Sequence, residues 1–185
     1  MVQEVPRREM HMRRIEMRAY ARDDGLWDVE ASLRDEKPYA YIDADRGPRQ
    51  AGDPVHDIRI RLTFDDGRVI RDVDVQMGSM PFGTCHEVKD TFRVLVGERI
   101  GPGWRNILKK IPRTATCTHA QELLVPMATA AVQGMALGRE PEGNASIVRD
   151  PVVATAPFFV NDCHSWRADG PVVAHFYPQF SRKKD

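Results

Sequence analysis

The sequence predicts an α+β fold in which an antiparallel sheet of two N-terminal hairpins is covered by C-terminal helices. Two observations carry the prediction: apolar and polar residues alternate in the first half of the chain, and apolar residues take helical spacing in the second half. Strands followed by helices is the order typical of α+β domains. At 185 residues, the chain is expected to form one domain over residues 1–185.

Each predicted hairpin has an Asp-Gly turn between two alternating runs, which is a strong short-range hairpin signal. The turns are Asp23-Asp24-Gly25 and Asp65-Asp66-Gly67. The alternating runs that flank them cover residues 14–20, 26–33, 58–64 and 69–77. The long connection between the hairpins is rich in Asp, Pro, Gly and Arg, and is expected to border a functional face.

The second half predicts three helices, over residues 85–96, 104–111 and 119–137. Thr116 or Thr118 is expected to cap the third helix with Glu122 as capping partner, and Pro126 to kink or restart it. Residues 140–185 are expected to form an extended arm that packs on the domain. Within it, residues 158–160 and 172–176 are expected to form either short strands or parts of the extended arm.

Composition and motifs exclude several function classes. Lys and Arg number 27 and Asp and Glu number 27, and this balance argues against a nucleic-acid binder. No apolar stretch reaches the ~18 residues of a membrane helix, and the first residues lack the apolar core of a signal peptide. A Gly-rich dinucleotide fingerprint, a P-loop and a Gly-x-Ser-x-Gly elbow are all missing from the sequence. The expectation is a cytoplasmic protein without nucleic-acid or membrane partners.

Every cysteine lies within two residues of a histidine, in Cys85-His86, Cys117-Thr118-His119 and Cys163-His164. The middle motif is the richest, because Glu122 follows it at an expected helix start, where backbone amides stabilise anions and thiolates.

Four interpretations of this middle motif remain open. Cys117 could be a thiolate nucleophile. His119 and Glu122 could transfer protons as a base and acid pair. Cys117 and His119 could be half of a metal site that Cys85 or His86 completes. The plain alternative is a helix cap with a buried thiol.

Three further groups of residues are candidates. His56-Asp57 precedes a predicted strand and forms a dyad only if the strand starts later, because adjacent strand residues face opposite ways. Arg22 and Asp24 lie at the first hairpin turn. Asp24 either stabilises the turn or acts as a ligand or a base. Aromatic side chains offer surfaces for an aromatic ligand, although each is also a candidate for the core. Those expected to bind a ligand are Trp27, Tyr39 and Trp104.

The ordered motifs resemble a bacterial family catalogued as domain of unknown function 2889, over nearly the whole chain. The motifs that carry the resemblance are Asp23-Asp24-Gly25-Leu26-Trp27-Asp28, Gly52-Asp53-Pro54-Val55-His56-Asp57, Pro81-Phe82 with Cys85, Ile100-Gly101-Pro102-Gly103-Trp104 and Cys117-Thr118-His119. The layout also looks like the fold of NifU-type and SufE-type iron–sulfur assembly proteins. That likeness implies zinc or an iron–sulfur cluster at Cys85, Cys117 and His119, although Asp24 stands where those scaffolds carry a cysteine.

The family resemblance also carries an association with lyases that cleave lignin-derived aromatic dimers and release formaldehyde without a cofactor. In that reaction a base removes a proton from a primary alcohol, a carbon–carbon bond breaks in retro-aldol fashion, and an acid protonates the leaving phenoxide. The expected acids and bases are His119 with Glu122 or His56 with Asp57, and Asp24 is a further candidate. The expected substrate-binding residues are Arg22, Trp27, Tyr39, Trp104 and Thr118, and a homodimer is the expected assembly. The alternative is a metal or iron–sulfur binding protein.

Overall fold

The structure is a computed structural model that describes residues 5–136, 138–139 and 154–182. The chain divides into two compact units, Met1–Ala136 and Leu137–Asp185. The expected packing of segment 140–185 on the rest of a single domain stays a prediction, and most of the expected loop at 140–150 lies outside the described residues.

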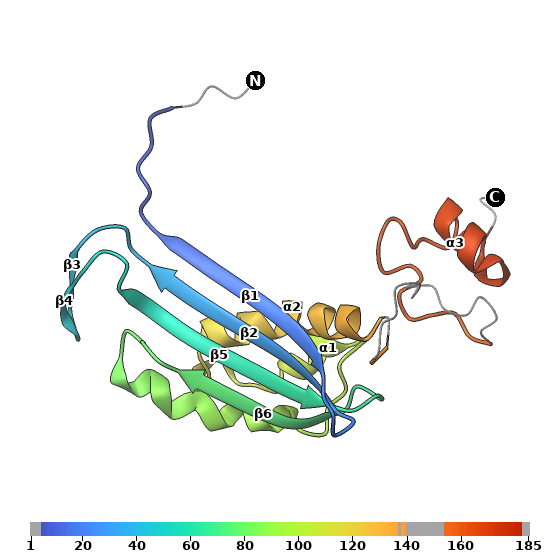
Figure 1. Cartoon of the computed structure of the whole chain (residues 1–185), viewed down its shortest axis with the longest axis horizontal. Helices are drawn as coiled ribbons and strands as arrows, with labels where there is room; N and C mark the ends of the chain where they lie inside the picture. The colour runs from blue at the N-terminus through green and yellow to red at the C-terminus, as the bar shows by residue number, and fades with distance from the viewer. Residues whose placement is uncertain (1–4, 137, 140–153, 183–185) are drawn as a thin grey trace. The chain divides into compact units, whose positions relative to one another are not determined.

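The first unit is built on a four-stranded antiparallel sheet (Figure 1). Its strands are β1 (Met12–Ala21), β2 (Trp27–Glu36), β5 (Pro54–Phe64) and β6 (Ile70–Met77), in the order β1-β2-β5-β6. Both predicted hairpins are confirmed, and the pairing of β2 with β5 joins them. The long connection between them contains a small hairpin of β3 (Tyr41–Asp43) and β4 (Gly47–Arg49).

The alternation along the strands decides which face of the sheet the helices cover. Trp27, Val29, Ala31 and Leu33 of β2 are buried, as are Ile58, Ile60, Leu62 and Phe64 of β5. These side chains share one face, because strand residues two apart point the same way. The helices lie against this face in Figure 1. An antiparallel sheet covered by helices on one face confirms the α+β class.

In the described part of the first unit, four helical segments follow the sheet. They are η1 (Gly83–Leu95), α1 (Trp104–Leu108), η2 (Arg113–Ala115) and α2 (Thr118–Met135). The first predicted helix is a 3₁₀ helix, and its Phe92 and Leu95 are buried. The second is shorter than predicted and ends at Leu108 rather than at 111.

The start of α2 differs from the sequence prediction. The N-cap residue is Cys117, and it makes no side-chain hydrogen bond to the helix, so the predicted capping by Thr116 or Thr118 is wrong. Thr118 is instead the first helical residue. The helix also runs through Pro126 without a restart, and its packing on β1 and β2 supplies the stability that one missing amide hydrogen bond removes.

In the second unit, the described residues contain α3 (Pro171–Phe176) and a short 3₁₀ turn, η3 (Pro178–Phe180). The predicted strand at 172–176 is therefore wrong, because Pro171 stands in the first helical turn, where its fixed φ favours a helix. Residues 158–160 form a turn and not a strand. Aromatic contacts hold this unit together: Phe159 and Trp166 have ring centroids 4.7 Å apart.

Candidate active site

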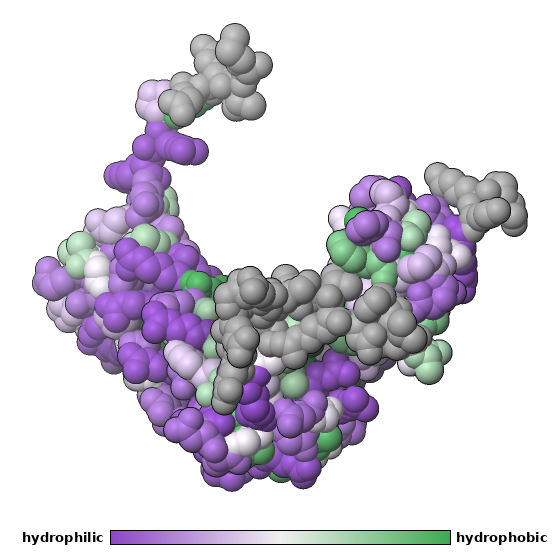
Figure 2. Space-filling view, turned by 45° about the vertical axis from the view of Figure 1, so that its right-hand side comes forward, coloured by the Kyte–Doolittle hydropathy of each residue, from purple (hydrophilic) through white to green (hydrophobic). Residues whose placement is uncertain are grey.

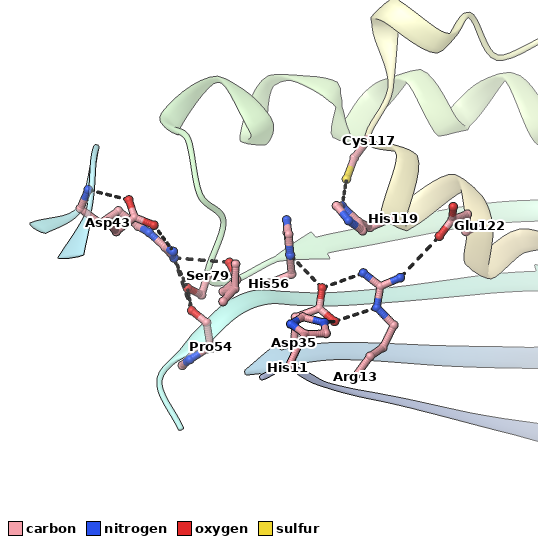
Figure 3. Close-up of polar contacts among 12 residues, drawn as sticks. His11, Arg13, Asp35, Asp43, Pro54, His56, Ser79, Cys117, His119 and Glu122 are labelled. Carbon is pink, nitrogen blue, oxygen red and sulfur yellow. Dashed lines mark hydrogen bonds and ion pairs between the residues drawn. The ribbon is translucent and has the colours of Figure 1, made fainter. Parts of the chain in front are cut away.

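A buried carboxylate and a buried imidazole meet where β2 and β5 pair. Asp35 on β2 lies opposite His56 on β5 in the strand register. Asp35 is 1% exposed and His56 is 9% exposed. The Nδ1 atom of His56 lies 2.9 Å from Oδ2 of Asp35, which is hydrogen-bonding distance (Figure 3). Both residues continue the inward-facing rows of their strands, but with polar side chains in place of apolar ones.

Arg13 on β1 fixes the Asp35 carboxylate from its other side. Its Nε and Nη2 atoms donate hydrogen bonds of 2.7 and 2.8 Å to the two carboxylate oxygens. Burial raises the pKa of Asp35, but the hydrogen bond and positive charge of Arg13, together with His56, outweigh it and lower the pKa overall. Asp35 is therefore an anion held in a fixed orientation.

His119 of α2 completes the cluster. Its ring centroid lies 4.0 Å from that of His56, with the rings inclined by 41°. The Sγ atom of Cys117 lies 3.8 Å from Nδ1 of His119 (Figure 3). His119 is only half-buried, so the cluster reaches the surface through this residue. We call Asp35, His56 and His119 the Asp–His–His cluster.

The surroundings of His56 favour its neutral form. Burial lowers its pKa, the neighbouring His119 lowers it further, and the hydrogen bond to Asp35 opposes both without reversing the shift. The anionic Asp35 accepts the hydrogen on Nδ1, so the neutral ring carries its lone pair on Nε2. A neutral imidazole with an oriented lone pair is the form that a general base requires.

The cluster also has the composition of a metal site. In the described part of the chain, Asp35, His56 and His119 are the group in which three potential ligand atoms lie within 4.8 Å of one another. The expected set of Cys85, Cys117 and His119 is not gathered in this way. Cys85 is half-buried in η1 and packs against the apolar core.

The expected pair of His119 and Glu122 is not formed as a hydrogen bond in the described residues. Glu122 is 61% exposed, and its Oε2 atom lies 3.6 Å from Nη1 of Arg13. Glu122 therefore reaches the cluster only through Arg13 (Figure 3). Thr118 is exposed on the first turn of α2, next to His119 in the chain.

The expected dyad of His56 and Asp57 is wrong, because β5 has already begun at Pro54. Adjacent residues of a strand point to opposite faces. Asp57 faces away from the helices, where its Oδ2 atom lies 3.7 Å from Nη1 of Arg34. His56 takes its carboxylate partner from β2 instead.

The residues of the first hairpin turn lie at the other end of the sheet. Arg22 donates two hydrogen bonds to Asp24, at 3.0 and 2.6 Å. Trp27 begins β2 and Asp35 lies eight residues further on, which is roughly 26 Å of extended strand. Arg22, Asp24 and Trp27 therefore belong to a different region from the cluster.

The two other aromatic candidates have different surroundings. Trp104 is 5% exposed, and its indole nitrogen donates a 2.7 Å hydrogen bond to the carbonyl of Leu124 in α2. It is a core residue that holds α1 against α2. Tyr39 is half-buried after the end of β2, and the Lys37 ammonium lies 5.7 Å from its ring centroid.

Sequence reasoning missed Asp35 and Arg13, and also His11, whose Nε2 atom lies 3.4 Å from Oδ1 of Asp35. A signal for Asp35 existed. The buried positions of β2 alternate from Trp27 to Leu33, and the next position on that face is an aspartate. An acidic side chain that continues an apolar row indicates a buried carboxylate that needs a partner.

Of three comparisons with known proteins, only the comparison with family models finds a match. A family model described as protein of unknown function (DUF2889) matches residues 11–133. No curated protein and no solved structure matches the chain, so the NifU/SufE-like fold stays a prediction. Among the described residues, no helix has both the length and the apolarity to cross a membrane.

Proposed function

The chain belongs to the DUF2889 family, whose description assigns no reaction, and from the site itself we propose that it catalyses proton transfer with His56 as the base. The single observation that carries this proposal is the 2.9 Å contact between His56 Nδ1 and the buried carboxylate of Asp35. The contact sets the tautomer and orientation of the imidazole, as an orienting carboxylate does in hydrolytic triads.

The two imidazoles divide the work between them. His56 is the base because its neutral form is favoured and Asp35 stabilises the positive charge that it acquires. His119, on the solvent side of His56, is the acid that returns a proton to the leaving group. Asp35 and Arg13 are positioning residues, and Arg13 keeps the carboxylate ionised.

The reaction that we propose is the cofactor-independent release of formaldehyde from an aromatic dimer that carries a primary alcohol. His56 removes the hydroxyl proton, and the oxygen electrons form the carbonyl of formaldehyde as the carbon–carbon bond breaks. The electrons of that bond form an alkene and expel a phenoxide, which His119 protonates. Bonds and charges balance without an oxidant. The acid–base cluster supports this chemistry, and the family resemblance supports the substrate class.

The test is to incubate the chain with lignin-derived dimers that carry a primary alcohol and to measure formaldehyde. His56→Gln should lower kcat by about 10²–10⁴-fold, and His119→Gln should lower it as well. His86→Gln is the matched control, because His86 is exposed in η1 and should leave turnover unchanged. Full activity in a folded His56→Gln variant would reject His56 as the base. Absence of formaldehyde from all dimers would reject the reaction.

A second candidate function is divalent metal binding, which the three ligand atoms within 4.8 Å favour. Two imidazoles and one carboxylate form a common transition-metal site. Asp35, however, already binds Arg13 through both oxygens, and this competes with a metal for the same lone pairs. Elemental analysis of protein purified without chelators separates the two functions. Stoichiometric metal that is lost in a His119→Gln variant would favour the metal site over the base.

A further inference from the structure

The face of the sheet opposite the helices contains a cavity of about 450 Å³. Most of its lining residues belong to the outward-facing rows of the four strands; they include Asp57 but not His56. The cavity is therefore separated from the Asp–His–His cluster by the sheet itself. Figure 2 shows that hydrophilic side chains cover most of the visible surface of the first unit. The volume falls in the range of small-molecule sites.

Two guanidinium groups in this cavity have no hydrogen-bond or ion-pair partner among the described residues. Arg59 and Arg61 are two residues apart on β5 and share the outward face. In the described part of the chain, neither side chain forms a hydrogen bond or an ion pair, and the Nε atom of Arg61 is buried without an acceptor. The other two arginines of the cavity, Arg18 and Arg34, are paired with Glu16 and Asp57. A buried donor without an acceptor is costly, and a bound anion removes that cost.

The residues beside the two arginines determine which further hydrogen-bonding groups a ligand needs. Ser32 and Gln76 lie directly across from Arg59 on the neighbouring strands. Glu30 and Asp74 lie across from Arg61, yet neither carboxylate comes within 4.0 Å of its guanidinium in the described structure. The cavity thus supplies donors from the two arginines and acceptors from Glu30 and Asp74; Oδ2 of Asp74 also accepts a 3.0 Å hydrogen bond from Nε2 of Gln76.

We propose that this cavity binds a polyhydroxylated carboxylate. The planar guanidinium groups of Arg59 and Arg61 match the two oxygens of a carboxylate. Glu30 and Asp74 accept hydrogen bonds from hydroxyl groups of the same molecule. A dianion such as phosphate fits less well, because those two carboxylates repel the second negative charge. The cavity lies on the opposite face of the sheet from His56, so the proposed ligand binding can be tested independently of the proposed proton transfer.

The test uses three probes of equal chain length and the full chain. Gluconate carries a carboxylate and hydroxyls, hexanoate carries the carboxylate alone, and sorbitol carries the hydroxyls alone. Titration calorimetry should give saturable binding of gluconate at one molecule per chain, weaker binding of hexanoate and none of sorbitol. In ¹⁵N-correlated NMR spectra, gluconate should shift the Nε–H signal of Arg61, because this group is buried without an acceptor in the described part of the chain.

The variants Arg59→Gln and Arg61→Gln should each weaken gluconate binding by at least about tenfold. Both positions lie on the outer face of the sheet, so the fold should persist. The charge-matched control is Arg105→Gln, an exposed position on α1, which should leave the affinity unchanged. The proposal is overturned if gluconate fails to saturate, if sorbitol or phosphate binds as tightly as gluconate, or if the β5 variants bind like the control.

Discussion

Asp35 and His56 lie 21 positions apart in the chain, directly opposite each other on antiparallel strands, with 2.9 Å between their polar atoms. Each is the polar end of an apolar row that faces the helices. A carboxylate that is 1% exposed persists as an anion only where its oxygens are hydrogen-bonded. Here Arg13 and His56 provide these bonds, so the same contacts stabilise the fold and orient the proposed base.

Replacement of Asp35 by Asn should therefore lower both stability and turnover. The amide has a donor group where the carboxylate has an acceptor. Either the bond from Arg13 Nε at Oδ1 is lost, or the bonds from Arg13 Nη2 and His56 Nδ1 at Oδ2 are lost. We expect the free energy of unfolding to fall by about 1–3 kcal/mol, measured by urea denaturation. The His56 tautomer is no longer fixed, so kcat should fall in the folded variant.

The control for this substitution is Asp24→Asn. Asp24 also pairs with an arginine, Arg22, but in an exposed turn. Exposed ion pairs contribute little because water screens them, so the urea midpoint should not change measurably. Equal losses in the Asp24 and Asp35 variants would contradict the structural role assigned to the buried carboxylate.

The lowered pKa of His56 predicts how stability depends on pH. Since the folded pKa is below the unfolded value of about 6.5, the unfolded chain binds more protons in the interval between the two values. The free energy of unfolding should therefore decrease as the pH falls below about 6.5, and level off below the folded pKa. Turnover should be lost in the same direction, because a protonated His56 cannot accept a proton.

Two histidine variants identify the residue responsible for this pH dependence. His56→Gln should flatten the slope of unfolding free energy against pH near 6.5, whatever its effect on absolute stability. His86→Gln, at an exposed position, should keep the slope of the original chain. An unchanged slope in His56→Gln would show that another group titrates in this interval.

Part of the site was within reach of the sequence. The Asp-Gly turn at residues 24–25 fixes the register of the first hairpin, and that register places Arg13 opposite Asp35. Counting outward from the turn would have found this ion pair. The alternation of side chains along a strand likewise shows that only one of His56 and Asp57 can face the helices.

The contact between Asp35 and His56 could not be predicted from the sequence in this way. It depends on the pairing of β2 with β5, which a long connection joins and whose register no turn dictates. The approach of His119 depends in turn on how α2 lies across the sheet. Tertiary packing decides both, and local sequence patterns carry little information on it. The strands, by contrast, follow from alternation and turn chemistry, which are local.

Trp104 should affect stability rather than turnover. Trp104→Phe keeps an aromatic ring in the core but removes the indole donor, which leaves the Leu124 carbonyl without this 2.7 Å bond. We expect a loss of about 1–2 kcal/mol in unfolding free energy and an unchanged KM for any substrate that is turned over. A raised KM with unchanged stability would indicate instead that Trp104 binds substrate, as the sequence first indicated.

The close approach of α2 to β1 depends on Gly134. A Cβ atom placed there would lie 2.3 Å from the Cβ atom of Ala19, a distance that non-bonded atoms do not tolerate. Ala favours helices over Gly by up to about 1 kcal/mol, yet overpacking costs about 1–3 kcal/mol, so Gly134→Ala should destabilise the chain in thermal denaturation. Adding Ala19→Gly should restore much of the loss, because the clash is between these two methyl groups. No recovery in the double variant would mean that the cost lies in the helix itself and not in its contact with the sheet.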